Sequence, residues 1–523
     1  MGVKQLDSAD VLWTILPMIL ITLFVRRLVT LRVRKPPNAR GVAILVLGDI
    51  GRSPRTMYHA ESFARAGWNT FIVGYKGTKV PPSLLTAPRI RFYYLTQPLK
   101  LPRKLFVLLA PYKVIHQLVT LVYGLTRGLY QHRPPQYILV QNPPSIPTLA
   151  VVQFLAWLRG CRVIIDWHNT GYSILALKLG PNHPLVKIAE IFERTFGRNA
   201  YAHLFVTDAM RVYLDKKWNL RGHKVVFHDR PPARFHASSA TEAHELLLRI
   251  PLFNPPILDF LPKVDPPVST FRTEVSSVSP GRSDFSIVSD VFSSPLPAFR
   301  ADRPALVVSS TSWTPDEDFG MLLEALQGYE KRARTQNAAG QVESKRLPKL
   351  MMVVTGKGPL QEPYMKKLLK LERSGKWEWV RCRTMWLEAA DYPLLLGAAD
   401  IGISLHSSSS ALDLPMKVVD MFGCGLPVCA LDFACLNELV IDGKNGLVFK
   451  DAQQLGSQLE MLLEGFPVTK ELDRLRSSLT VNTERMYHQA RGAVEPWCTW
   501  ETNWDAKIRP LVDPDVARDV MTG

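Results

Sequence analysis

The stretch from Leu412 to Ala430, LDLPMKVVDMFGCGLPVCA, places two carboxylates around one lysine and then ends in glycines and a proline. Asp413 lies four positions before Lys417, and Asp420 lies three positions after it. Glycine and proline end helices, so the helical pattern should stop soon after Asp420. A helix packed in a core needs none of these charges. The stretch is therefore either an ordinary helix end or the wall of a site for a phosphorylated ligand.

A second candidate group lies in the loop DIGRSPR, residues 49–55. Gly51 allows another group to approach the backbone closely, and Arg52 and Arg55 offer two guanidinium groups. The loop matches neither the Walker A pattern nor GxGxxG, which disfavours a P-loop enzyme and a dehydrogenase. The alternative is that both arginines belong to a solvated face.

A third candidate is His168 in DWHNTGY, which directly follows a strand-like run. Side chains at the carboxyl ends of parallel strands lie at the edge of a binding crevice. A histidine there can act as a general base, and Asp166 either points away or orients it. The alternative is a structural histidine that is simply hydrogen-bonded.

Short apolar runs separated by helix-length segments must position these groups. The run Val42–Leu47 ends in glycine, which is typical of a buried parallel strand. Strands that alternate with helices predict a doubly wound sheet, and the pattern occurs in two halves. The further expected strands of the first half lie in residues 70–73, 137–144, 161–171 and 202–208, and those of the second half begin at 305–309.

The expected organisation has five parts. It comprises a membrane anchor (1–35), a Rossmann-like domain (36–236), a Ser/Pro-rich loop or linker (237–301), a second Rossmann-like domain (302–480) and a closing helix that packs back toward the first domain (481–523). In the second domain, Thr314 is expected to cap a helix, with Glu317 completing a capping box.

Composition favours a folded protein with anionic partners. The chain has 523 residues, 46% of them hydrophobic, and a net charge of +17. This charge favours nucleic acid, an anionic membrane surface or a phosphorylated substrate. Nucleic-acid binding is disfavoured because zinc-finger and ribonucleoprotein motifs are absent. The six cysteines form no CxxC pair, which suits free thiols in a reducing compartment.

The apolar run Val11–Val25 is followed by a cluster of arginines, which predicts a tilted single membrane span with the remaining chain in the cytosol. The alternative is a buried core helix. Residues 104–130 and 145–160 are also long and apolar. Each is either a core helix or a helix with one face in the lipid headgroup region.

Six motifs in order, VLGDIGRSPR, IDWHNTGYSILAL, VTDAM, SSTSWTPDEDFGMLLEAL, TGKGP and DLPMKVVDMFGCGLPVCAL, resemble the chitobiosyldiphosphodolichol beta-mannosyltransferase family. The resemblance covers most of the chain except the Ser/Pro-rich segment. It implies a GT-B fold, an anchor in the endoplasmic reticulum membrane and a cytosolic active site. It also implies GDP-mannose as donor, GlcNAc-GlcNAc-diphosphate-dolichol as acceptor and an inverted β-1,4 product. Other mannosyltransferases of the pathway are conceivable partners, and no tightly bound cofactor is expected.

Roles follow from this resemblance. Inverting transfer needs a base, for which His168 is the first candidate and Asp49 its rival. The departing diphosphate is assigned to Lys417 and to the backbone of Leu414–Met416, and the ribose to Asp420. Further donor contacts are expected from Ser310, Thr311, Ser312 and Gly356. The acceptor diphosphate is assigned to Gly51, Arg52 and Arg55, with Arg230 as a third candidate.

The chain also departs from the pattern of related GT-B enzymes. Asp413 lies one position closer to the second acid than their Glu, seven residues, Glu spacing requires, so it is either the first acid or a helix N-cap. The run Asp316–Asp318 looks like a metal-binding DxD, but helix N-terminal acids are the better interpretation, and no metal is expected. The remaining alternatives are a retaining GT-B transferase with another acceptor and a non-catalytic scaffold subunit.

Overall fold

The computed structural model describes residues 38–98, 106–131, 134–250, 257, 259–275, 296–314, 317–338, 345–407, 412–479 and 497–513. The membrane anchor expected in residues 1–35 lies outside this part of the chain. Within it, no helix combines the length and the apolar character that a membrane crossing requires. The described residues form two compact units, and residues from Arg509 onward belong with those up to His228.

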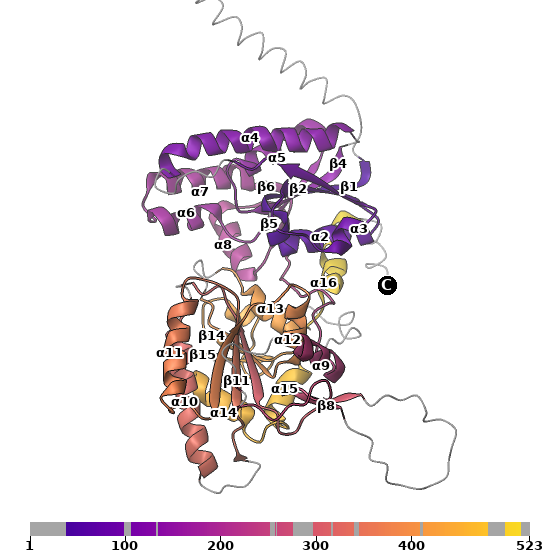
Figure 1. Cartoon of the computed structure of the whole chain (residues 1–523). Coiled ribbons are helices and arrows are strands. Elements are labelled where there is room, and N and C mark those ends of the chain that lie inside the picture. The colour runs from indigo at the N-terminus through magenta and orange to yellow at the C-terminus, as the bar shows by residue number, and fades with distance from the viewer. Residues whose placement is uncertain are drawn as a thin grey trace, which may run out of the picture. The chain divides into compact units, whose positions relative to one another are not determined.

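The first unit is built on a seven-stranded parallel sheet with the order β3-β2-β1-β4-β5-β6-β7 (Figure 1). The strands are β1 (Asn38–Asp49), β2 (Asn69–Tyr75), β3 (Ile90–Leu95), β4 (Pro135–Asn142), β5 (Arg162–Trp167), β6 (Asn199–Phe205) and β7 (Arg221–Val226). The helices are α2 (Pro54–Arg65), α3 (Pro82–Thr86), α4 (Phe106–Gln131), α5 (Thr148–Arg159), α6 (Gly171–Leu179), α7 (Pro184–Gly197), α8 (Asp208–Trp218) and α17 (Arg509–Val512). Residues 42–47 are buried, as expected for a strand covered on both faces.

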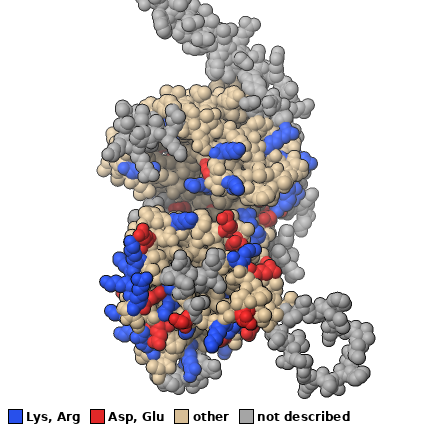
Figure 2. Space-filling model, viewed as in Figure 1, with Lys and Arg blue, Asp and Glu red and all other residues tan. Residues whose placement is uncertain are grey.

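The second unit contains a six-stranded parallel sheet with the order β12-β11-β10-β13-β14-β15. Its strands are β10 (Ala305–Ser310), β11 (Leu350–Thr355), β12 (Val380–Met385), β13 (Ile401–Ser404), β14 (Val428–Leu431) and β15 (Gly446–Phe449). Its helices are α9 (Ala240–Arg249), α10 (Phe319–Ala338), α11 (Gln361–Arg373), α12 (Asp391–Ala398), α13 (Met416–Gly423), α14 (Ala452–Leu463), α15 (Lys470–Ser477) and α16 (Trp500–Lys507). Lysines and arginines gather on the surface near α11 (Figure 2).

Alternate residues of β10 point into two separate cores of this unit. Ala305 and Val307 pack with α10 and α14, whereas Leu306 and Val308 pack with α9, α12 and α13. This period of two is what a strand covered by helices on both faces requires. Two Rossmann-like doubly wound halves, as the sequence predicted, are therefore confirmed.

The expectation of a loop or linker over residues 237–301 does not hold for its described parts. It contains α9 and the hairpin of β8 (Thr273–Val275) and β9 (Pro297–Phe299). Arg272 is buried and forms an ion pair with Asp400 of 2.8 Å between Nη1 and Oδ2. Ser239 caps α9 with a capping box, so local sequence chemistry and a distant carboxylate both order this segment.

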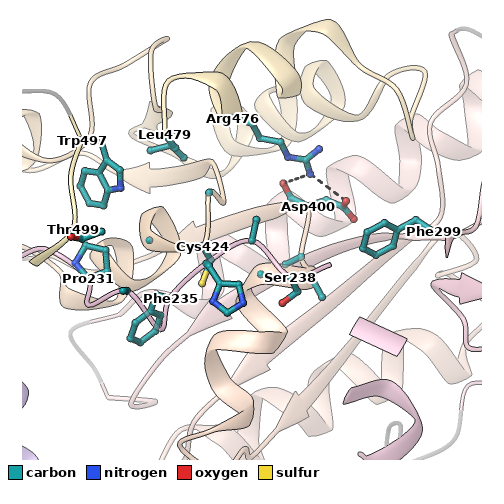
Figure 3. Close-up of a pocket in the computed structure, with 18 of the residues that line it drawn as sticks. Pro231, Phe235, Ser238, Phe299, Asp400, Cys424, Arg476, Leu479, Trp497 and Thr499 are labelled. Carbon is teal, nitrogen blue, oxygen red and sulfur yellow. Dashed lines mark hydrogen bonds and ion pairs between the residues drawn. The ribbon is translucent and has the colours of Figure 1, made fainter. Parts of the chain in front are cut away.

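Residues before 237 pack within the second unit, where they line a cavity of about 550 Å³. Pro231 and Trp497 line it on one side, and Arg476 and Asp400, which form an ion pair, line it on another (Figure 3). The segment after His228 thus packs against α12, α13 and the chain before α16. The unit boundary lies at Asp229, whereas the sequence placed the domain boundary after residue 236.

The chain then returns to the first unit through α17. Tyr201 donates its hydroxyl to the carbonyl oxygen of Leu511 at 2.8 Å, and Arg40 forms an ion pair with Asp513. Val512 is buried. The expected closing segment therefore contains a part that packs within the first unit, while residues 480–496 lie outside the described chain.

Candidate active site

The carboxyl ends of β10 and β11 form the floor of the candidate donor site in the second unit. Ser310 Oγ accepts hydrogen bonds from Thr355 Oγ1 at 3.1 Å and from Tyr392 Oη at 3.0 Å. Gly356 has a φ of 106°, and a Cβ atom there would collide with the carbonyl oxygen of Thr311. Only glycine tolerates both the left-handed backbone and this close approach. The ends of the two strands are thus held together where a ligand of this sheet would bind.

Glu317 is a central residue of this site that the sequence analysis assigned to another role. It is buried, and its carboxylate accepts hydrogen bonds from Thr311 Oγ1 and from the N–H of Ser312. Its other oxygen lies 3.1 Å from Nζ of Lys417. The carboxylate therefore holds the loop after β10 in place and fixes the position of the Lys417 ammonium group.

The expected capping box at Thr314 and Glu317 is wrong because α10 begins later, at Phe319. Asp318 caps it instead, with Oδ1 accepting the N–H groups of Gly320 and Met321. Glu317 pairs with a lysine that lies 100 residues away, and no local pattern could have indicated this partner.

Lys417 and Asp420 both belong to α13, as the opening stretch of the sequence predicted. The helix begins at Met416 with Pro415 as N-cap, and no side chain caps this end. The alternative N-cap role of Asp413 is therefore wrong. The role of Leu414–Met416 in contacting the diphosphate stays a prediction, as does the first-acid role of Asp413.

Asp420 has an unusual environment for a carboxyl group. Burial raises its pKa to about 8, and the opposing effect of Arg234 is partly offset by the negative charge of Asp229. Asp420 also raises the pKa of the nearby Tyr392, for which burial is the larger cause. Near neutral pH the carboxyl is protonated and can both donate and accept a hydrogen bond. Such a group suits a hydroxyl-bearing ligand such as a ribose.

The candidate base lies in the first unit, where Asp166 contacts one arginine and two histidines. Arg55 donates Nε and Nη2 to the two oxygens of this buried carboxylate at 2.8 and 2.9 Å. His168 Nε2 lies 2.8 Å from Oδ2, and His59 Nε2 lies 3.6 Å from the same oxygen. Burial alone would raise the pKa of Asp166, but Arg55 and His168 hold it well below its usual range.

This geometry determines which nitrogen of His168 can react. An ionised Asp166 only accepts hydrogen bonds, so Nε2 of His168 carries the proton that it donates. In the neutral ring, Nδ1 is then the free acceptor. The backbone N–H of His168 is fixed by the carbonyl oxygen of Asn142 at 2.9 Å. Asp166 and the backbone thus fix the orientation of the ring, and the role of His168 as general base stays a prediction.

Asp49, the rival base, is already satisfied by hydrogen bonds. It accepts the N–H and Oγ1–H of Thr78 at 2.8 and 2.7 Å and the N–H of Gly51 at 3.0 Å. Burial acts to raise its pKa, but these hydrogen bonds and Arg52 lower it overall. A carboxylate with a lowered pKa is a weak base, so the geometry favours a structural role in the loop after β1.

The predicted diphosphate contacts differ in their exposure and in their partners. Arg52 is 80% exposed and available to a ligand, whereas Arg55 is buried against Asp166. Arg230 is buried in the second unit, where its guanidinium lies 4.9 Å from the ring of Trp497. Arg52 and the backbone at Gly51 remain candidates, and the geometry favours structural roles for Arg55 and Arg230.

A metal centre is not apparent in the described ranges. There, no three side chains of His, Cys, Asp or Glu gather closely enough to hold an ion. Of the acids that follow β10, Glu317 forms an ion pair with Lys417, and Asp318 caps the start of α10.

Comparison with known proteins identifies the family. Residues 51–229 match a model described as a glycosyl transferase 4-like domain, and residues 329–465 match one described as glycosyl transferases group 1. The chitobiosyldiphosphodolichol beta-mannosyltransferase of Mus musculus is 41% identical over 92% of this chain and 91% of its own length. The chain belongs to the chitobiosyldiphosphodolichol beta-mannosyltransferase family.

Other relatives agree with this family, and a solved structure shares the fold. The Homo sapiens protein of the same description is 40% identical over 92% of this chain and 94% of its own length. A protein of Arabidopsis thaliana described as the UDP-glycosyltransferase TURAN is 39% identical over 91% and 97%. A sucrose-phosphate synthase from Thermosynechococcus elongatus has a TM-score of 0.52 at 12% identity, covering 92% of this chain and 99% of that structure. The protein is therefore a glycosyltransferase, and it has the GT-B fold.

Proposed function

We propose that the chain transfers mannose from GDP-mannose to GlcNAc-GlcNAc-diphosphate-dolichol with inversion, forming a β-1,4 linkage in the synthesis of the N-glycan precursor. The observation that carries this proposal is the 40–41% identity to relatives of this activity over 92% of the chain. Two further observations support it: the first unit holds a histidine hydrogen-bonded to a buried carboxylate, and the second holds a lysine fixed by Glu317.

In the proposed reaction, Nδ1 of His168 takes the proton of the acceptor hydroxyl. The hydroxyl oxygen attacks the anomeric carbon of mannose, and the bond from that carbon to the diphosphate oxygen breaks. GDP leaves with the bonding electrons, and Lys417 offsets the charge that develops on it. Glu317 keeps the ammonium group in place through the 3.1 Å ion pair. Ser310, Thr311, Ser312 and Gly356 would line the donor, and Asp420 would hold the ribose hydroxyls.

The proposed location is the endoplasmic reticulum membrane, with the anchor in residues 1–35 and both units in the cytosol. The acceptor carries a lipid, and the chain has a net charge of +17, which favours an anionic surface. Protease treatment of sealed microsomes tests this arrangement. Both units should be digested without detergent, and full protection would contradict a cytosolic site.

The reaction is tested with the purified full-length chain and a phytanyl-linked chitobiosyl diphosphate. GDP-mannose should give a product that β-mannosidase removes and α-mannosidase leaves intact. Because one relative is described as a UDP-glycosyltransferase, UDP-sugars form the second arm. Transfer from a UDP-sugar alone would favour that second function. Absence of transfer from every donor would favour a scaffold subunit.

A further inference from the structure

An apolar cavity of about 430 Å³ lies in the first unit, apart from the contacts of the candidate base. Its walls come from the ends of β1 and β2, the loop after β4, and helices α4, α6 and α7. Leu47, Ile146 and Leu175 are among its apolar walls, and Lys113 is its charged side chain. The volume lies within the range of roughly 300–1,000 Å³ typical of small-molecule sites. We propose that this cavity binds the first isoprene units of the acceptor's polyisoprenyl chain.

The cavity shares its framework with the candidate base. Pro143, one of its lining residues, directly follows Asn142, whose carbonyl oxygen holds the backbone N–H of His168. Gly171 also lines the cavity and lies three residues after His168, so their Cα atoms are at most about 11 Å apart. A lipid anchored here would thus hold the polar end of the acceptor in the neighbourhood of the histidine.

Helix α4 separates this cavity from an apolar surface. Val114 and Gln117 line the cavity, whereas Ile115, Val119 and Tyr123 are exposed on the outside. The surface over α4 contains few charged groups (Figure 2). An exposed apolar helix face of this kind favours contact with lipid. A chain leaving a bilayer at this face would enter the cavity by passing one helix.

Charge at the cavity supports an occupant with an anionic end. Lys113 is exposed at its edge, so the ammonium group can meet a diphosphate in solvent while the chain occupies the apolar interior. Only the acceptor's lipid must be held beside the loop that positions His168, and a phospholipid acyl chain has no such requirement. The combination therefore favours the substrate's own lipid. This inference rests on the proposed function, because that function supplies the lipid-linked acceptor.

Filling the cavity tests the inference. Leu175→Trp should lower kcat/KM at least tenfold for the phytanyl-linked acceptor and leave it unchanged for an acceptor with a short alkyl chain. The matched control is Leu177→Trp on the same helix, where the side chain is 65% exposed and does not line the cavity. Equal effects on both acceptors, or the same loss in the control, would overturn the inference. GDP binding and the thermal midpoint should match the wild type.

A second measurement uses the unaltered full-length chain. A phytanyl diphosphate that carries a benzophenone on its chain should label peptides containing residues 143–146 or 171–175 on irradiation. Excess dolichyl phosphate should compete, whereas phosphatidylcholine vesicles should not. Labelling confined to other segments, or competition by phosphatidylcholine alone, would contradict the proposed site. If the wild type transfers no mannose to either acceptor, the proposed function fails. Labelling still tests whether the lipid chain binds in the cavity.

Discussion

Asp166 is the buried carboxylate that orients His168, the proposed general base. It binds Arg55 through both oxygens, and Nε2 of His168 and Nε2 of His59 lie 2.8 and 3.6 Å from its Oδ2. Burial lowers the pKa of His59, despite the opposing effect of Asp166. His59 therefore contributes little positive charge near neutral pH. Arg55 therefore supplies the main positive charge that compensates Asp166.

Replacing His168 with alanine should lower kcat by about 100- to 10,000-fold, the usual contribution of a general base. Donor binding should not change, because the proposed donor contacts lie in the second unit. The measurement combines turnover with GDP-mannose titration by calorimetry. His223→Ala, an exposed histidine of the same unit, is the control and should keep full activity. Loss of GDP-mannose binding in His168→Ala would instead make His168 a sugar contact.

The pKa of Asp420, raised to about 8, predicts a pH-dependent stability. The unfolded carboxyl ionises near pH 4, while the folded one stays protonated, so the wild type loses stability as pH rises from about 4 to 8. Asp420→Asn removes this loss and should raise the free energy of unfolding at pH 8 by at least about 1 kcal/mol. Urea titrations at pH 5 and 8 measure it. A variant with the wild-type pH slope would exclude this role of Asp420.

At the scale of elements, the candidate site residues of each unit lie at the ends of strands. Glu317 follows β10 and holds a lysine of α13, and Gly356 follows β11 and lies against Thr311. In the other unit, β5 ends in the pair of Asp166 and His168. Within each sheet, parallel strands place such positions at the edge formed by their carboxyl ends, where loops can shape the backbone without disturbing the core.

Gly356→Ala should therefore damage the donor site. Its φ of 106° and its close approach to Thr311 predict a cost of about 1–3 kcal/mol and weaker GDP binding. Gly328→Ala is the matched control, because this exposed position in α10 has nothing within 4 Å of an added Cβ. It should stabilise by roughly 0.5–1 kcal/mol, since alanine favours helix. Thermal unfolding and GDP calorimetry distinguish the two, and equal effects would contradict the argument.

The sequence predicted the elements of this fold better than the partners within them. Runs such as Val42–Leu47 indicate buried strands, because the apolar residues and the glycine that ends the run are neighbours in the sequence. The position of His168 at a strand end followed in the same way. Asp166 and Arg55 are 111 residues apart, and Glu317 and Lys417 are 100 apart, so their pairing depends on the sheet order. That order brings together charges whose roles no local spacing could indicate.

At the scale of the whole molecule, the first unit is assembled from both ends of the described chain. Tyr201 donates a hydrogen bond to Leu511, and Arg40 forms an ion pair with Asp513. Val512 is buried, and its carbonyl oxygen accepts a hydrogen bond from the hydroxyl of Tyr137 at 3.5 Å. The second unit is inserted between these segments. The two units are therefore linked by two crossings of the chain.

Truncation after Ile508 should destabilise the first unit selectively. Tyr201 would lose the acceptor of its hydroxyl, and the apolar surface under Val512 would become exposed, at a combined cost of about 2–4 kcal/mol. Hydrogen exchange should rise in β6, while β10 to β15 keep their protection. Asp513→Ala is the milder control, since it removes only the ion pair with Arg40. Unchanged exchange in β6 would contradict a structural role of the return.

This return of the chain has a consequence for synthesis on the ribosome. The second unit can fold as soon as its own residues emerge, whereas the first must wait for residues made after the whole of the second. At roughly 5–20 residues per second, this delay lasts tens of seconds. During that time the seven-stranded sheet lacks its final cover. The unit that is translated first is therefore the one that is completed last.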